Sequence, residues 1–140
     1  MFVSYDGNSV LEAIVPKILV MDDDLEIREM LTDVLHWEGY DVLGAADGRQ
    51  GLKTFRSERP DLVITDILMP NVDGIEAIIQ MKRERPDVKI IAMSGGGMSS
   101  EFNWLRCARK FGASDVITKP FRASALLDSV HECIGGPRVH

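Results

Sequence analysis

The sequence has few of the residues and segments that mark secreted, membrane-spanning or metal-thiolate proteins. Its 140 residues contain only two cysteines, Cys107 and Cys133. The sequence leaves a disulfide between them open, but their places in separate predicted helices favour free thiols in a reducing cytosol. The three histidines, His36, His131 and His140, show no metal-ligand spacing. We therefore expect a cytoplasmic protein without a histidine-ligated metal.

Long hydrophobic runs and an excess of positive charge are also absent. No apolar stretch approaches the roughly 20 residues that cross a bilayer. The short apolar piece at 10–15 follows no Lys or Arg, so it lacks the basic start of a secretory signal. The net charge of −6 argues against a general nucleic-acid binder but is compatible with a local basic patch. We expect no membrane insertion and no direct binding of nucleic acid.

Apolar segments rich in Val and Ile alternate with amphipathic segments along the chain. The hydrophobic fraction of 45% and the charged fraction of 27% are typical of one globular domain. Continuous apolarity of this kind is typical of strands that are covered on both faces. We predict strands near 17–22, 40–45, 61–66, 88–94 and 114–118.

The intervening segments have the periodicity of helices. In the first of them, apolar residues recur at i, i+3, i+4, i+7 and i+8 from Ile27 to Leu35, and Gly39 follows as a stop signal. The other helices are predicted at 48–57, from 74 to just before Pro86, at 100–111 and at 123–134. Strict alternation of strand and helix predicts an α/β fold with a doubly wound, five-stranded parallel sheet. We expect residues 17–134 to form this domain.

The two ends of the chain lie outside the alternation. Residues 1–16 could be a flexible extension, an additional helix or a non-native remnant. Residues 135–140, which begin with Gly-Gly-Pro, read as a C-terminal tail.

Charged and polar residues stand where the predicted strands end. Asp22 and Asp23 follow the first strand, Asp66 ends the third, Ser94 ends the fourth and Lys119 ends the fifth. Right-handed crossovers place the carboxyl ends of parallel strands on one rim, which is where ligands bind in such sheets. The sequence therefore predicts one site built from these five residues.

Three carboxylates at one rim repel one another unless a cation neutralises them. Mg²⁺ prefers oxygen ligands and commonly uses one or two carboxylates together with water. We expect Asp23 and Asp66 to be direct ligands and Asp22 to bind directly or through water. The backbone carbonyl of Leu68 would complete the protein ligands.

A carboxylate beside Mg²⁺ and an ammonium group is also a competent nucleophile toward phosphorus. Lys119 would supply a cation and Ser94 a hydroxyl donor for the negative charge of a phosphoryl group. The glycines at 95–97 give room for a bulky anion. They are better interpreted as a hinge than as a nucleotide cradle, because no P-loop Lys-Ser/Thr pair follows them.

Four motifs in order resemble the response-regulator receiver family over residues 17–134. They are Asp22-Asp23, the run 66–70 (Asp-Ile-Leu-Met-Pro) with Asp73-Gly74, Ser94-Gly95, and the run 118–121 (Thr-Lys-Pro-Phe). The resemblance implies a flavodoxin-like (βα)5 fold, Mg²⁺ dependence and a cis peptide bond between Lys119 and Pro120. It also implies that Asp66 accepts a phosphoryl group from a phosphohistidine of a histidine kinase or a histidine phosphotransfer protein.

The resemblance further implies a chemotaxis-type single-domain switch rather than an enzyme that acts on external substrates, apart from slow autodephosphorylation. Phosphorylation would change how the face formed by the fourth helix, fifth strand and fifth helix binds a downstream protein. A Mg²⁺ phosphatase of similar fold would need an acidic residue two positions after the nucleophile, where Leu68 stands. Asp24, in turn, is expected to cap the first helix.

Two features depart from the family pattern. Val116 stands three residues before the lysine, where receivers usually carry an aromatic switch residue, and the glycine-rich loop after Ser94 looks longer than usual. Two alternatives therefore stay open: a phosphorelay intermediate and a constitutive interaction module whose site does not switch. Phe102 and Trp104 on the fourth helix could belong to the core or to a partner surface.

Overall fold

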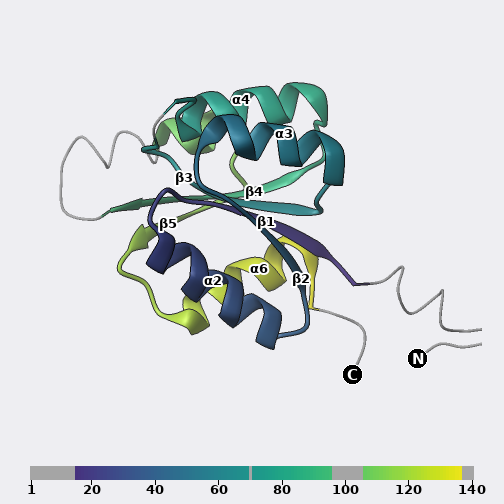
Figure 1. The fold of residues 1–140 in the computed structure, drawn as a ribbon, viewed down its shortest axis with the longest axis vertical. Coiled ribbons are helices and arrows are strands. Elements are labelled where there is room, and N and C mark those ends of the chain that lie inside the picture. Colours follow the sequence, from purple (N-terminus) through teal and green to yellow (C-terminus); the bar gives the residue numbers. More distant parts are fainter. Residues whose placement is uncertain (1–14, 70, 96–105, 137–140) are drawn as a thin grey trace, which may run out of the picture.

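Five parallel strands form the centre of the molecule in a computed structural model that describes residues 15–69, 71–95 and 106–136. The strands lie in the order β2-β1-β3-β4-β5 (Figure 1). They are β1 (Lys17–Met21), β2 (Asp41–Ala45), β3 (Leu62–Asp66), β4 (Lys89–Gly95) and β5 (Asp115–Lys119). The predicted doubly wound α/β fold is confirmed, and each strand lies within one residue or so of its predicted range.

Helices cover both faces of this sheet (Figure 1). The helices α3 (Gly48–Glu58) and α4 (Gly74–Glu84) lie on one face, and α2 (Leu25–Trp37) and α6 (Ala123–Ile134) lie on the other. Residues 106–110 are also helical and residue 111 lies in a turn, whereas residues 100–105 of the helix predicted at 100–111 fall outside the described residues.

The helix ends follow from local side chains. Asp24 caps α2, as predicted, because its carboxylate accepts hydrogen bonds from the amides of Glu26 and Ile27. Asp47 and Asp73 cap α3 and α4 in the same way. These caps fix where each helix leaves the rim at the carboxyl ends of the strands.

The core consists of two apolar layers, one on each face of the sheet, because successive strand residues point to opposite sides. Leu19 and Val63 pack under α3 and α4, whereas Ile18 and Leu62 pack against α2 and α6. Val116 belongs to the first layer. The same division separates the cysteines, because Cys107 packs against the first layer and Cys133 against the second.

Both cysteines are free, as predicted. Phe102 and Trp104 lie outside the described residues, as do 1–14 and 137–140, so the predictions for them stay predictions. Within the part of the chain that the structure describes, no helix combines the length and apolarity needed to cross a bilayer.

Candidate functional site

The turn between β1 and α2 holds two of the predicted carboxylates. Asp22 is fully buried, and its backbone amide donates to the carbonyl of Ala45 at 3.1 Å, which continues the pairing of β1 with β2. The amide of Asp24 donates to Asp22 Oδ1 at 2.9 Å. Asp23, the next residue, is exposed. The turn therefore buries one carboxylate and presents its neighbour to solvent.

Asp66 closes β3 and is 8% exposed. Its Oδ1 accepts a hydrogen bond from the amide of Leu68 at 3.2 Å. Gly74, the first residue of α4, packs directly against the backbone of Asp66, and a Cβ at that position would clash with the Asp66 carbonyl oxygen. The close approach of α4 thus requires glycine and fixes the end of β3.

Lys119, the last residue of β5, bridges two of the carboxylates. Its Nζ donates to Asp22 Oδ2 at 2.8 Å and to Asp66 Oδ2 at 3.2 Å. The lysine side chain is 16% exposed, so this contact is shielded from most of the solvent. The Lys119–Pro120 peptide bond is cis, as the resemblance implied.

Burial and charge act in opposite directions on these groups. Desolvation raises the pKa of Asp66 above its ordinary value, although the positive charge of Lys119 opposes the rise. Desolvation acts to lower the pKa of Lys119, but its hydrogen bond to Asp22 and the charge of Asp66 outweigh this effect and raise the lysine pKa overall. The ammonium form of Lys119 is thus held by the carboxylates that surround it.

One carboxylate oxygen from each of Asp22, Asp23 and Asp66 lies within 4.8 Å of the other two. Ligand oxygens on opposite sides of an octahedral Mg²⁺ ion are about 4 Å apart, since each bond is about 2.0–2.1 Å long. The donor set and its spread therefore fit a magnesium ion that is bound partly through water. Both oxygens of Asp22 already accept hydrogen bonds, which suits a water-mediated role for that residue.

Ser94 lies at the same rim, as its position at the end of β4 predicts. Asp66 pairs in register with Met93, so Ser94 stands one residue further along the neighbouring strand. The side chain of Ser94 is buried, and its hydroxyl donates to the carbonyl of Gly95 at 3.2 Å. Pro70 and residues 96–97 of the predicted site region lie outside the described residues. The ligand role of the Leu68 carbonyl stays a prediction.

Two residues that hold the rim in place were not predicted from the sequence. The Nη1 atom of Arg28 donates to the carbonyl of Asp22 at 2.6 Å and thereby fixes the acidic turn from α2. The side-chain amide of Asn71 donates to the carboxylate of Asp47 at 3.0 Å and links the loops that precede α4 and α3. A basic residue in the helix turn that follows an acidic pair is a weak signal for the contact of Arg28 with Asp22. Nothing in the sequence indicates the contact of Asn71 with Asp47.

Comparison with known proteins agrees with this geometry. The sequence model described as the response regulator receiver domain matches residues 18–131. The sporulation initiation phosphotransferase F of Bacillus subtilis (strain 168) is 37% identical over 114 residues, which cover 81% of this chain and 90% of the relative. The chemotaxis protein CheY of Thermotoga maritima is 35% identical over 117 residues, which cover 83% of this chain and 95% of the relative.

A longer relative and a solved structure match the same region. The probable transcriptional regulator ycf27 of Porphyridium aerugineum is 40% identical over 111 residues, and this chain spans 44% of its length. A crystal structure of a response regulator receiver domain protein from Clostridium thermocellum superposes with a TM-score of 0.80 at 30% identity, covering 86% of this chain and 94% of that one.

Proposed function

The chain belongs to the response regulator receiver family of two-component signalling, and on this premise we propose that Asp66 accepts a phosphoryl group from a phosphohistidine. The donor would be a histidine kinase or a histidine phosphotransfer protein. The observation that carries the proposal is the bridge from Lys119 to both Asp22 and Asp66 at the rim where three carboxylates meet.

In the transfer step, an Asp66 carboxylate oxygen forms a new bond to phosphorus while the bond from phosphorus to the imidazole nitrogen breaks. The electron pair of the broken bond stays on the imidazole. Asp66 must be ionised to attack. Burial raises the pKa of Asp66, and the positive charge of Lys119 opposes this rise. The Nζ of Lys119, already beside Asp66 Oδ2, is placed to contact an oxygen of the transferred group.

Asp22, Asp23, Asp66 and the Leu68 carbonyl would hold Mg²⁺ in this proposal. The bound ion would supply positive charge to the phosphoryl oxygens. The Ser94 hydroxyl, buried one residue beyond the register partner of Asp66, would donate to the same group after a rotation away from the Gly95 carbonyl. Charge stabilisation at developing phosphoryl oxygens is the main contribution that proteins make to such transfers.

Phosphorylation would then shift an equilibrium between two conformations and alter the binding of a downstream protein. The affected face would comprise the helix around 106–110, β5 and α6. Val116 stands on β5 in place of an aromatic residue and is packed into the layer under α3 and α4. The switch would therefore work without a rotating ring at this position.

A second candidate function is that of a phosphorelay intermediate. One relative of nearly the same length is named a sporulation initiation phosphotransferase, and the proposed site would serve relay and switch equally well. Back-transfer of the phosphoryl group to a histidine phosphotransfer protein would favour the relay. A change in affinity for a downstream protein would favour the switch.

Intact-mass spectrometry after incubation with acetyl phosphate and Mg²⁺ tests the proposal. We expect one added phosphoryl group on the wild type, and none when Mg²⁺ is removed by EDTA. Asp66→Asn should abolish the adduct, whereas the control Asp128→Asn, which changes an exposed carboxylate on α6, should leave it intact. An adduct that survives Asp66→Asn would remove Asp66 from the role.

A further inference from the structure

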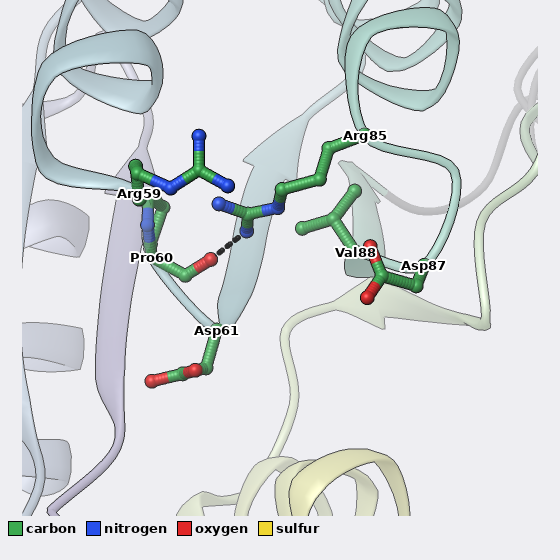
Figure 2. A pocket seen from close by; sticks show the side chains of 6 residues that line it. All are labelled: Arg59, Pro60, Asp61, Arg85, Asp87 and Val88. Carbon is green, nitrogen blue, oxygen red and sulfur yellow. Dashed lines mark hydrogen bonds between the residues drawn. The ribbon is translucent and has the colours of Figure 1, made fainter. Parts of the chain in front are cut away.

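A polar cavity lies at the opposite rim of the sheet from the acidic cluster. It has a volume of about 300 Å³ and lies between the ends of α3 and α4 and the starts of β3 and β4 (Figure 2). Its lining residues are Arg59, Pro60, Asp61, Arg85, Asp87 and Val88. Because β3 runs through five residues from this rim to Asp66, the cavity is roughly 16 Å away from the proposed phosphoacceptor.

Two guanidinium groups face each other at this cavity, as Figure 2 shows. Arg85 is anchored, because it lies over the ring of Phe55 at 4.8 Å and donates to the carbonyl of Pro60. Arg59 is the C-cap residue that follows α3, and its backbone adopts the left-handed conformation with φ 50°. Among the residues that the structure describes, no side chain forms a hydrogen bond or an ion pair with the Arg59 guanidinium.

The acidic residues of the cavity form no ion pair with these two arginines within the described residues and offset their charge only in part. The carboxylate of Asp61 accepts a hydrogen bond from the backbone amide of Lys17 at 2.8 Å, and Figure 2 shows it directed away from the arginines. Asp87 forms no ion pair with either arginine within the described residues. Burial and the nearby charge of Arg59 lower the pKa of Arg85, and the charges of Asp87 and Asp61 oppose this effect without outweighing it.

We propose that this cavity binds the anionic group of a small phosphorylated or carboxylated molecule between Arg59 and Arg85. Guanidinium groups present planar forks of N–H donors that match the oxygens of phosphate and carboxylate. An anion placed between the two groups relieves their mutual repulsion and uses the donors that Arg59 leaves unengaged. The cavity is at the small end of the range for ligand sites, which limits the ligand to a small molecule.

The ligand would also carry hydroxyl or ammonium donors. Asp87 lines the cavity near Arg85 and offers carboxylate oxygens that only accept hydrogen bonds. This site shares no residue with the acidic cluster, so it stands independently of the proposed phosphoryl transfer.

Titration of the full chain with inorganic phosphate, followed by amide NMR shifts in Mg²⁺-free buffer at constant ionic strength, tests the proposal. We expect saturable shifts at the amides of Asp61 and Val88. Shifts confined to Asp66 and Leu68 would place phosphate at the other rim and would overturn the proposal, as would shifts that never saturate. A parallel titration with acetate identifies the preferred anion, since the anion that binds more tightly carries the group that the site recognises. If neither phosphate nor acetate binds, the proposed site is wrong.

Arg59→Gly provides the decisive variant, because it removes the unengaged guanidinium while glycine suits the left-handed backbone. We expect the dissociation constant to rise by roughly tenfold or more, the usual effect of losing a charge-assisted hydrogen bond. The control Lys53→Gln removes one exposed positive charge from the same helix and should leave the constant nearly unchanged. Equal weakening by both variants would show general attraction to a basic surface and would refute a specific site.

Discussion

Lys119 and Asp66 make contact although β4 lies between their strands in the sheet. The lysine Nζ lies 3.2 Å from Asp66 Oδ2, and the same ammonium group lies 2.8 Å from Asp22 Oδ2. One cation therefore joins the ends of β1, β3 and β5. The arrangement holds the acidic cluster together, and it also places a positive charge beside the carboxylate that we propose as the phosphoacceptor.

Lys119→Met should destabilise the protein in Mg²⁺-free buffer. Its loss leaves two buried carboxylates without their cation, so we expect the free energy of unfolding to fall by about 2–3 kcal/mol. Urea unfolding in the presence of EDTA measures this change. Lys110→Met, at an exposed position, is the matched control and should change the free energy by less than about 0.5 kcal/mol. Equal effects of the two substitutions would contradict a structural role for the bridge.

Asp23→Asn should weaken Mg²⁺ binding by roughly tenfold or more, because it removes one carboxylate charge from the proposed ligand set. Isothermal titration calorimetry measures the dissociation constant. Asp24→Asn is the control, since asparagine caps a helix about as well as aspartate does and Asp24 acts as the N-cap of α2. If Asp24→Asn weakened binding as much as Asp23→Asn, the ligand assignment would be wrong.

Gly74→Ala should destabilise the protein and displace the end of β3 that carries Asp66. The added Cβ would clash with backbone atoms of Asp66 and Ile67, which are rigid, so we expect a loss of about 2–3 kcal/mol in the free energy of unfolding. The rate of phosphorylation by acetyl phosphate should fall as well. Gly44→Ala is the control, because its Cβ would meet only the flexible side chain of Arg28. A Gly74→Ala variant that is as stable as the wild type and is phosphorylated normally would contradict the need for a close approach of α4 to β3.

Tyr40→Phe should lower the free energy of unfolding at neutral pH by about 1 kcal/mol, since the Tyr40 hydroxyl donates to the carbonyl of Gly135 at 2.9 Å. Burial, assisted by the charge of Glu38, raises the pKa of Tyr40 from its ordinary 10.0 to about 12.

A raised phenol pKa means that the folded state favours the neutral form. The contribution of Tyr40 to stability is therefore fully present below pH 10 and is lost as the pH rises through about 12. Unfolding of both proteins across this range should show the advantage of the wild type shrinking toward alkaline pH. A difference that stayed constant would contradict the raised pKa.

Periodicity and strand-end residues sufficed to predict the architecture. Solid apolar runs such as 18–21 belong to strands that are covered on both faces, and such strands permit few arrangements once crossovers are right-handed. The convergence of Asp22, Asp66 and Lys119 followed from that topology alone, because all three end parallel strands. Helix caps such as Asp24 could also be predicted from the sequence, since a cap depends only on the few residues next to it.

The contacts that arginine side chains make at the surface could not be predicted. From the sequence, Arg28 on α2 resembles any solvated helix residue. In the structure its guanidinium donates to the carbonyl of Asp22. Arg59 and Arg85 are separated by 26 positions, and the cavity between them depends on how α3 and α4 end. No periodic pattern encodes these contacts, because an arginine on a polar helix end is compatible with many different partners.

The most direct measurement locates the phosphoryl group within the chain. After reaction with acetyl phosphate and Mg²⁺, borohydride reduction converts an aspartyl phosphate to homoserine, and peptide mass spectrometry then identifies the modified residue. We predict modification at Asp66, the carboxylate that contacts Lys119 at the end of β3. Modification at Asp22, Asp23 or a position away from this rim would contradict it.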